Sequence, residues 1–578
     1  MLTALTIRNF KRFNEVTVEL GNPVVFVGPN DSGKTTALQA LALWDIGLRK
    51  WNEKRAGRSA PEKRPGVTVN RRDLIAVPVP YANLLWRDLH VRDVQRQAED
   101  SKSRQQTRNI RIDIIVEGVT ADRAWKCGLE FDYANEESFY CRPLRLSEAR
   151  QPERMPIPEE ASRERVCFLP PMSGLADREF AKQAGEISFL LGQGRTAEVL
   201  RNLCWQVSQA PGGGDRWSKV CGQIKHLFGV SLDAPQYLAE RGELVMTYRD
   251  RRGIRLDLSS SGRGMQQTLL LLIHMAANPN SVLLLDEPDA HLEILRQRQI
   301  YQVLTDTARE HRSQVILASH SEVILNEAAD RDVVVAFLGR PHRIDDRGSQ
   351  LLKSLKSIGY ADYYQAELRG WVLYLEGSTD LTILRVFADK LRHEAGNVLE
   401  QPFVHYVGNH PSRASDHFFG LREAKPDLAG IAVFDRLSQP LQACGPLKLR
   451  MWRRREIESY LCTRRTLLAW SEAAAEELGP VFAASWVSVM DESIRKMEDS
   501  LRNLRKGDPW GPDLKVSEEF LEPVFCAFFD KLGLPNRMNK SDYHDLARYL
   551  PVEEYDAEIS QVLDDIVATA KAATPFES

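Results

Sequence analysis

The segment VVFVGPNDSGKTTALQALAL, residues 24–43, decides the fold of this chain. Its first four apolar residues predict a buried strand, and the apolar residues that recur after Thr35 predict a helix. Between them, residues 28–35 fit the pattern GxxxxGK[ST] in the strand, loop and helix setting that a phosphate-binding loop requires. The sequence therefore predicts a nucleotide site with ATP as cofactor.

The chemistry of such a loop assigns roles to its residues. Backbone amides and the helix N-terminus cradle phosphate, Lys34 reaches the outer phosphates, and the hydroxyl of Thr35 binds Mg²⁺. The residues expected to bind the nucleotide are Gly28, Asn30, Ser32, Gly33, Lys34, Thr35 and Thr36.

A second apolar strand, in VLLLDEP at residues 282–288, ends in two acids. Asp286 is expected beside the Mg²⁺, and Glu287 where it can polarise the attacking water. Two acids after a strand are often only a solvated turn, but the upstream loop favours the catalytic interpretation.

Two further segments resemble ATP-binding-cassette ATPases of the structural-maintenance and DNA-repair type. LSSSGRGMQQ, residues 258–267, is similar to the cassette signature, which in that family comes from a second subunit. ASHSE, residues 318–322, is similar to the switch-histidine segment, so His320 would contact the γ-phosphate. The resemblance implies an ATP-driven homodimer or higher oligomer in which the signature acts in trans through Ser260, Ser261 and Gly262.

Acids at strand ends recur in the second half of the chain. They lie in YLEGSTD (374–380), after IAVF (431–434) and in RREIESYL (454–461). Hard divalent cations prefer oxygen ligands, and a two-metal phosphodiesterase site needs several such ligands. The last two acids would share one face of an extended segment. The predicted ligands of Mg²⁺, with Mn²⁺ as a second choice, are Glu376, Asp380, Asp435, Glu456 and Glu458.

This arrangement resembles the Toprim domain of topoisomerases, primases and certain nucleases, in which Glu376 and Asp435 would be catalytic. The family commonly carries Asp-x-Asp at the second strand end, whereas here Leu437 takes the place of the second acid. A cassette ATPase followed by Toprim resembles the overcoming-lysogenisation-defect (OLD) nucleases over about residues 1–465. That resemblance also offers Lys540 as a lysine near the scissile phosphate, although a solvated lysine is an equal alternative.

The predicted fold class is α/β. We expect an ATPase domain at residues 1–345, a Toprim domain at 370–465 and a helical region at 466–578. Within the first domain, 176–229 is expected to be a helical insert, and the resemblance to the OLD family implies that this insert serves dimerisation. Residues 51–108 are rich in basic residues and predict either a solvated loop or a nucleic-acid surface.

Composition limits the function classes. The formal charge of −3 and the pI near 6.5 provide no overall basic field. The eight cysteines form no CxxC pair, which argues against a zinc ribbon. No signal peptide or membrane span is apparent, so the expected location is cytoplasmic, with no membrane partner, and a transporter ATPase is the weakest alternative.

The leading prediction is an ATP-regulated, Mg²⁺-dependent endonuclease that cleaves nucleic acid, with DNA favoured over RNA. The family resemblance implies a role in anti-phage defence, where a separately encoded partner would be compatible. Two alternatives remain open: an ATPase sensor whose degenerate Toprim domain binds without cutting, and a Toprim RNase acting on tRNA.

Overall fold

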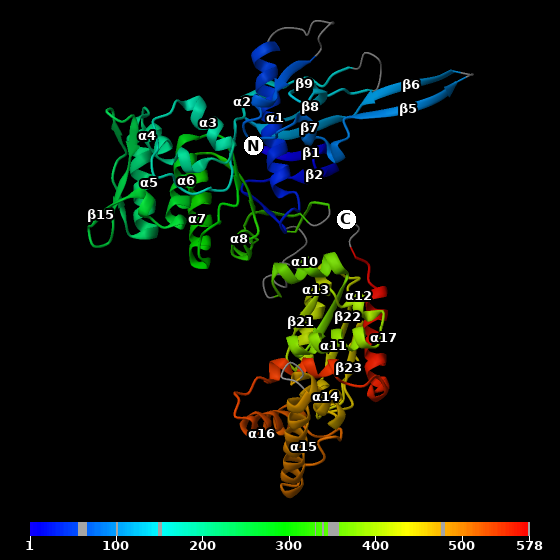
Figure 1. Ribbon diagram of the computed structural model, residues 1–578. Coiled ribbons are helices and arrows are strands. Elements are labelled where there is room, and N and C mark those ends of the chain that lie inside the picture. The colour runs from blue at the N-terminus through cyan, green and yellow to red at the C-terminus, as the bar shows by residue number, and fades with distance from the viewer. Residues whose placement is uncertain are drawn as a thin grey trace. The chain divides into compact units, whose positions relative to one another are not determined.

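The structure is a computed structural model in which the chain forms two compact units, residues 1–352 and 353–578 (Figure 1). It describes residues 1–55, 66–99, 102–147, 153–329, 331–337, 340–344, 358–475 and 480–575.

An antiparallel sheet opens the first unit. Its strand order is β2-β1-β7-β8-β9-β4, so strands from both ends of the first 143 residues lie side by side. Burial alternates along part of β1, for example at Leu5 and Ile7, because successive side chains of a strand point to opposite faces of the sheet. The strands are β1 (Leu2–Phe10), β2 (Phe13–Glu19), β4 (Val67–Asn70), β7 (Arg111–Thr120), β8 (Arg123–Asn135) and β9 (Ser138–Pro143).

The second sheet of this unit has the order β10-β16-β17-β3-β18-β19 and is parallel except for its last strand. Helix α1 (Lys34–Arg55) shares one hydrophobic core with both sheets, and its Leu41 and Trp44 are fully buried. The phosphate loop therefore joins the central strand β3 to a helix fixed by packing. The strands are β3 (Val24–Val27), β10 (Val166–Leu169), β16 (Val282–Asp286), β17 (Gln314–Ser319), β18 (Val333–Ala336) and β19 (His342–Arg343).

Helices and short strands surround this sheet. The predicted helical segment 176–229 contains three α-helices. The helices are α2 (Glu159–Arg163), α3 (Ala184–Gly192), α4 (Leu200–Gln209), α5 (Gly213–Phe228), α6 (Arg263–Ala277), α7 (Ile294–Glu310) and α8 (Glu322–Ala328). The short strands are β11 (Ser231–Leu232), β12 (Gln236–Leu238), β13 (Glu243–Val245), β14 (Thr247–Arg249) and β15 (Arg255–Asp257).

The interpretation of residues 51–108 as a loop is wrong for most of that segment. Helix α1 continues to Arg55, β4 joins the antiparallel sheet, and β5 (Arg92–Glu99) pairs with β6 (Lys102–Asn109) in a hairpin that projects from the sheet (Figure 1). Residues 56–65 lie outside the described part of the chain. The hairpin sequence carries hydrophilic residues on both faces, so it lacks the apolar alternation by which a half-buried strand is identified.

The second unit is built on a parallel sheet of order β21-β20-β22-β23. Side chains of the sheet and of the C-terminal helices share one core, which includes Leu373, Phe525 and Ile566. The strands are β20 (Trp371–Leu375), β21 (Val404–Tyr406), β22 (Ala429–Phe434) and β23 (Leu447–Met451). The helices are α10 (Tyr360–Arg369), α11 (Ser378–Lys390), α12 (Ala395–Val398), α13 (Pro411–Ala424), α14 (Arg464–Ala474), α15 (Pro480–Asn503), α16 (Glu522–Leu532) and α17 (Ala557–Lys571).

All eight cysteines are free thiols. Within the described ranges, we find no helix with the length and apolar character needed to cross a membrane.

Candidate functional site

The phosphate loop folds around its own lysine. Lys34 is 6% exposed, and its Nζ donates hydrogen bonds to the carbonyl oxygens of Gly28 at 2.7 Å and Pro29 at 2.6 Å. Ser32 Oγ accepts a third bond at 3.4 Å. Burial lowers the pKa of Lys34, although nearby carboxylates oppose this effect. The ammonium is thus held at the mouth of the loop, where a phosphate can replace the carbonyls as its partner.

Two glycines make this loop sterically possible. Gly28 and Gly33 have φ angles of +156° and +103°, which L side chains rarely adopt. A Cβ on Gly33 would also lie 2.5 Å from the ring of Phe13, which follows the turn between β1 and β2. The loop is therefore held closely against the antiparallel sheet.

The predicted Mg²⁺ ligands of the first unit meet directly. Thr35 Oγ1 donates to Asp286 Oδ1 at 3.1 Å, although the residues are 251 positions apart. Burial raises the pKa of Asp286 to about 6, against the opposing effects of Thr35 and Lys34. A buried carboxylate next to a hydroxyl supplies the oxygen ligands that Mg²⁺ prefers.

Glu287 and His320 lie at the ends of neighbouring parallel strands. Asp286 pairs with Ala318 in the β16–β17 ladder, and His320 Nε2 is 3.5 Å from Glu287 Oε1. Glu287 has a φ of 48°, and its N–H donates to Ala318 O at 2.9 Å. A left-handed φ is uncommon for a glutamate and is found at functional sites where surrounding structure enforces it. Both side chains are about 40% exposed, so solvent reaches them.

The signature-like residues cap the start of α6. Ser260 Oγ donates to Asp257 O at 2.6 Å, and Ser261 Oγ donates to Leu258 O at 2.7 Å. A Cβ added to Gly262, the N-cap of α6, would meet no atom within 4 Å, so the helix N-terminus is accessible. The backbone N–H groups at the start of α6 can therefore donate hydrogen bonds to an anion.

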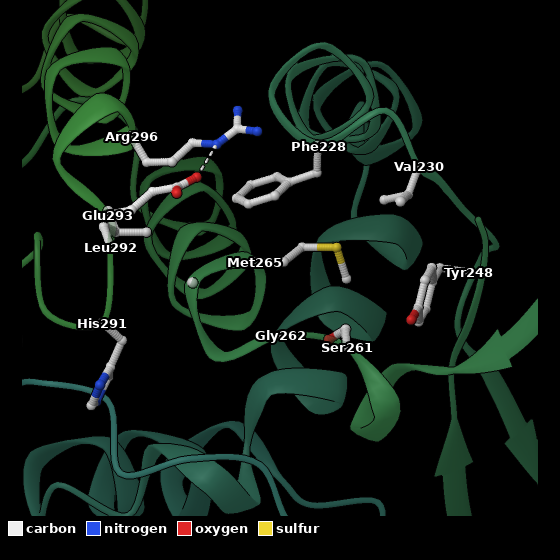
Figure 2. Close-up of a pocket in the computed structure, with 11 residues that line it drawn as sticks. Phe228, Val230, Tyr248, Ser261, Gly262, Met265, His291, Leu292, Glu293 and Arg296 are labelled. Carbon is white, nitrogen blue, oxygen red and sulfur yellow. Dashed lines mark ion pairs between the residues drawn. The ribbon is translucent and has the colours of Figure 1, made fainter. Parts of the chain in front are cut away.

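A cavity of about 360 Å³ lies beside this helix start (Figure 2). Ser261 and Met265 line one part of it, and Leu292, Glu293 and Arg296, from the segment after Asp286, line another. The signature-like segment and the segment after the two acids thus form one continuous surface.

Sequence reasoning missed the residue that supports the signature-like segment. Arg201 is 1% exposed, and its guanidinium donates to Ala176 O at 2.8 Å and to Asp257 Oδ1 at 3.1 Å. The same Asp257 oxygen accepts the backbone N–H of Ser259 at 2.8 Å. Arg201 thereby orients the carboxylate that caps this turn. The sequence offers no pattern that would reveal this role, because Asp257 lies 56 positions away and the nearest acid, Glu198, pairs with Arg195 instead.

In the second unit, four of the predicted acids converge beyond the carboxyl ends of β20 and β22. Glu376 N donates to Asp380 Oδ2 at 3.1 Å, and Ile457 N donates to Asp435 Oδ1 at 3.2 Å. Burial, the charges of Glu376 and Glu458, and hydrogen bonding with Glu376 raise the pKa of Asp435 to about 9.

Two other acids show the same electrostatic strain. Burial, followed by the charge of Glu376, raises the pKa of Asp380 to about 6. Burial, followed by the charge of Glu456, raises the pKa of Glu458 to about 8. Burial and mutual repulsion disfavour ionisation of these neighbouring carboxyl groups. A divalent cation bound between them would neutralise their charge and so favour the ionised forms.

The expectation that Glu456 and Glu458 share a face of an extended segment is wrong. Glu456 precedes a one-turn 3-10 helix, Ile457–Tyr460, that contains Glu458. Glu456 instead accepts hydrogen bonds from the N–H and Oγ of Ser517, at 2.5 and 2.9 Å. It thus ties this turn to the segment before α16.

Two lysines lie near this acidic site. Lys540 is about half exposed and 3.7 Å from Glu518, and its charge also acts on Glu456 and Glu458. Lys515, which was not among the predicted site residues, donates a hydrogen bond from Nζ to Glu518 Oε1 at 2.5 Å. This contact, with smaller effects of the charges of Glu456 and Glu376, raises the pKa of Lys515. The backbone N–H of Leu437 donates to Met451 Sδ at 3.2 Å.

Comparison with known proteins supports the assignment of the first unit. Residues 1–117 match a family model described as "AAA ATPase domain", and residues 219–326 match one described as "AAA domain, putative AbiEii toxin, Type IV TA system". Residues 28–36 lie in the first matched range, and Asp286, Glu287 and His320 lie in the second. The first unit contains an ATPase domain.

Curated relatives match this chain over shorter stretches. The oligopeptide transport ATP-binding protein AppD of Bacillus subtilis is 31% identical over 77 residues, 13% of this chain and 23% of the relative. The dipeptide transport ATP-binding protein DppD of Haemophilus influenzae is 26% identical over 160 residues, 25% of this chain and 46% of the relative. The chain thus spans about a quarter and about half of these relatives' lengths.

Solved structures with low TM-scores include the SMC head domain from Thermotoga maritima, at 14% identity and a TM-score of 0.31, covering 59% of this chain and 98% of that one. The Smc head domain derived from Pyrococcus furiosus gives 12% identity, a TM-score of 0.33, and 60% and 96% coverage. The recombination mediator protein RecF is 10% identical with a TM-score of 0.31, and the match covers 60% of this chain and 98% of RecF. Such TM-scores carry no argument about function.

A further cluster in the second unit was absent from the sequence predictions. Asp362, His405 and His417 come together although they belong to three different elements. Burial alone would raise the pKa of Asp362, but hydrogen bonds from the two histidines outweigh it and hold the pKa of this carboxyl well below its usual value. Burial lowers the pKa of His417.

Proposed function

We propose that this chain is an ATP-binding and hydrolysing, Mg²⁺-dependent endonuclease that hydrolyses phosphodiester bonds, with DNA as the favoured substrate. The observation that carries the nuclease assignment is the convergence of four carboxyl groups, of which Glu458 is buried and Glu376, Asp380 and Asp435 are half-buried. The pKa values of Asp380, Asp435 and Glu458 are raised. Proteins with open parallel sheets bind their ligands beyond the carboxyl ends of the strands, and these acids lie beyond the carboxyl ends of β20 and β22. The resemblance to Toprim and OLD nucleases supports the same assignment.

In the proposed reaction, Glu376 and Asp435 hold the catalytic cation, and Asp380 and Glu458 complete its surroundings. A bound Mg²⁺ or Mn²⁺ supplies Lewis-acid activation of water and of the phosphodiester. Lys540 orients the scissile phosphate through its exposed ammonium. The Lys540 side chain is 51% exposed, which leaves the ammonium accessible to a ligand.

In the ATPase domain, Lys34 binds the outer phosphates of ATP, and Thr35 and Asp286 hold its Mg²⁺. Glu287 orients the attacking water, and His320, 3.5 Å from it, contacts the γ-phosphate. These groups follow the carboxyl ends of the adjacent strands β16 and β17, where they would face the γ-phosphate of a bound ATP.

The nuclease proposal is tested by incubating purified protein with supercoiled DNA, linear DNA and total tRNA, in Mg²⁺ or Mn²⁺, with and without ATP. We expect metal-dependent cutting of DNA that is lost in Glu376→Gln and kept in Glu400→Gln, a matched control at an exposed position. Cutting by Glu376→Gln at the wild-type rate would refute the proposed site. Cleavage of tRNA alone would change the substrate from DNA to RNA.

We also propose that ATP drives formation of a homodimer. Beside the signature-like surface, Ile294 and Leu295 are 70% and 78% exposed, an apolar pair that a second copy would cover. Light scattering of Glu287→Gln should show a doubled mass with ATP and a monomer without it, and Glu287→Gln/Leu295→Asp should remain a monomer. A molar mass that is the same with and without ATP in both variants would contradict this proposal.

A second candidate is an ATPase sensor whose second unit binds nucleic acid without cutting it. Leu437 in place of an acid and the engagement of Glu456 by Ser517 favour this alternative, because both reduce the ligands available to a second cation. If wild type hydrolyses ATP and binds DNA but cuts no substrate, while Leu437→Asp cuts, the sensor replaces the nuclease as the function. The role in phage defence rests on the family resemblance alone.

A further inference from the structure

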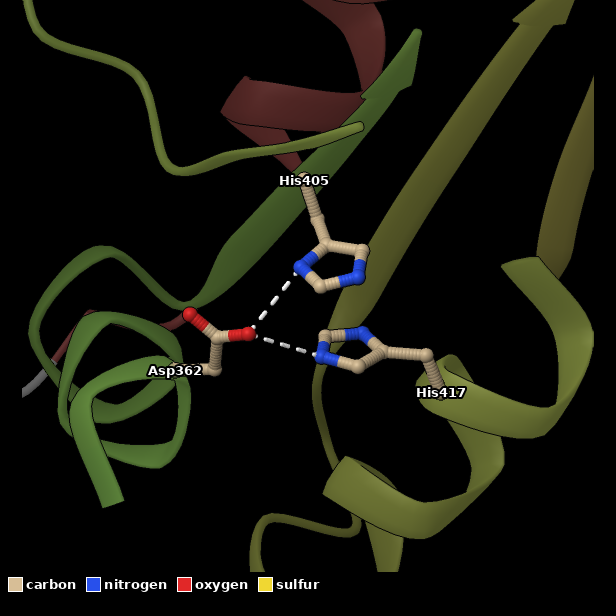
Figure 3. Close-up of side chains that lie close together, drawn as sticks. All are labelled: Asp362, His405 and His417. Carbon is tan, nitrogen blue, oxygen red and sulfur yellow. Dashed lines mark hydrogen bonds and ion pairs between the residues drawn. The ribbon is translucent and has the colours of Figure 1, made fainter. Parts of the chain in front are cut away.

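Three side chains of metal-ligating type converge in the second unit, apart from the proposed catalytic acids. Asp362 comes from the first turn of α10, His405 from β21 and His417 from α13 (Figure 3). Their ligand atoms all lie within 4.8 Å of one another, and no other trio of His, Cys, Asp or Glu in the described part of the chain satisfies this criterion.

The distances fit a small divalent cation. Asp362 Oδ2 is 3.0 Å from His405 Nδ1 and 3.0 Å from His417 Nε2. Metal–ligand bonds of ~2.0–2.1 Å in tetrahedral geometry place ligand atoms about 3.3 Å apart. A cation therefore requires the two carboxylate–imidazole distances to lengthen by only a few tenths of an ångström, and the two histidine nitrogens already lie within 4.8 Å of each other.

Tyr374 supports one of these histidines in the manner of an outer-shell partner. Its hydroxyl lies 2.9 Å from His417 Nδ1, the ring nitrogen opposite the one that faces Asp362. Metal-ligating histidines usually hydrogen-bond through their second nitrogen, which fixes the ring orientation. The β20–β21 ladder pairs Tyr374 with His405, so one strand pair positions both the ligand and the supporting group.

The two imidazoles stack, with ring centroids 3.7 Å apart and planes 15° from parallel. Two charged rings would repel strongly at this separation, so at least one is neutral, the form in which histidine binds metal. Parallel rings direct their lone pairs alongside each other, so one must tilt to share an ion. His405 is the ring able to do so, because it lies on an edge strand and its side chain is 32% exposed, against 9% for His417.

From this geometry we propose that Asp362, His405 and His417 form a binding site for a divalent transition metal, with Zn²⁺ the preferred ion. Two imidazoles and one carboxylate are a common zinc ligand set, in which solvent or a substrate takes the fourth position. Such a site differs from the oxygen-only ligands at Glu376 and Asp435, which suit Mg²⁺ or Mn²⁺. The ion would connect α10, β21 and α13. The proposal does not depend on the nuclease function.

Cobalt tests this site, because tetrahedral Co²⁺ absorbs visible light much more strongly than octahedral Co²⁺. Full-length protein is stripped with a chelator, desalted and titrated with Co²⁺. We expect a visible band that saturates near one equivalent in wild type and is displaced by Zn²⁺. His417→Gln and Asp362→Asn should each weaken binding at least tenfold, and Tyr374→Phe should weaken it about tenfold.

Two matched variants separate this site from others. His410→Gln changes an exposed histidine next to α13, and Glu376→Gln changes the acidic site, so both should keep the cobalt band. An absent wild-type band, or a band unchanged in His417→Gln, would overturn the proposal, and loss only in Glu376→Gln would assign the ion to the acids. Because a variant can lose structure, the Zn²⁺-dependent rise in unfolding temperature is measured for each, and it should be absent only from the ligand variants.

Discussion

Replacing Asp435 with asparagine is expected to stabilise the metal-free protein. Its pKa of about 9, against 3.8 for a free aspartate, means that the folded state keeps a proton that the unfolded chain releases. Between these two values the folded state binds more protons, so the free energy of unfolding falls as pH rises, by up to about 1.4 kcal/mol per pH unit. Asparagine removes this dependence because it has no proton to lose.

The size of the effect follows from the same shift. Between pH 3.8, the pKa of a free aspartate, and pH 7, the loss of unfolding free energy caused by Asp435 is at most ~4 kcal/mol, at 1.36 kcal/mol per pH unit. Residual solvent contact and relaxation reduce this value, and the amide oxygen can keep the hydrogen bond from Ile457 N, so we expect a gain of about 1–2 kcal/mol. For a unit of this size, that gain raises the unfolding temperature by roughly 3–6 °C.

The assay is thermal unfolding from pH 5 to pH 9 in EDTA and again in excess Mg²⁺. Wild type should lose stability as pH rises in EDTA and regain it with Mg²⁺, whereas Asp435→Asn should show a weaker response to both. Asp416→Asn, which changes an exposed acid of α13, should behave as wild type. An Asp435→Asn protein that is less stable than wild type at pH 8 in EDTA would refute the electrostatic reasoning.

Three further predictions concern the ATPase domain. Lys34→Ala should abolish the stabilisation of the protein by Mg-ATP in thermal melts, whereas Lys54→Ala, at an exposed position of the same helix, should preserve it. Gly33→Ala should lower the free energy of unfolding in urea by about 1–3 kcal/mol and weaken ATP binding, because φ is +103° and the added Cβ meets the Phe13 ring. As a control, Gly214→Ala should be neutral or stabilising, because a Cβ there meets nothing within 4 Å. Arg201→Leu should lower the free energy of unfolding in urea by about 1–3 kcal/mol because it removes the hydrogen bonds to Ala176 O and Asp257 Oδ1, and no loss would show that these bonds are dispensable.

The sequence predicts those parts of the fold in which a local pattern coincides with burial. The strand at residues 24–27 and the helix that follows it are present because the loop motif joins two elements that are both apolar enough to reach the core. The meeting of Thr35 with Asp286 is also predictable, because parallel strands place their carboxyl ends at one edge of a sheet.

Prediction was poorer where long-range contacts decide the structure. The hairpin at 92–109 is a strand pair made of hydrophilic residues, which composition alone cannot separate from a loop. The engagement of Glu456 by Ser517 joins positions 61 apart and has no local signal. The grouping of Asp362 with His405 and His417 likewise depends on how three elements pack, and no spacing in the sequence announces it.

The nucleotide site of the ATPase domain and the acidic site of the second unit share one electrostatic principle. In the ATPase domain, burial lowers the pKa of Lys34 and raises that of Asp286 to about 6, and in the second unit it raises that of Asp435 to about 9. Each group is therefore held where its charged form is penalised until a ligand of opposite charge arrives. The ligands differ, since Lys34 requires a phosphate and Asp435 requires only a cation. Mg²⁺ alone should therefore stabilise the second unit, whereas the ATPase domain should respond to Mg²⁺ and ATP together, so melts of Lys34→Ala and Asp435→Asn under both conditions assign each response to its own site.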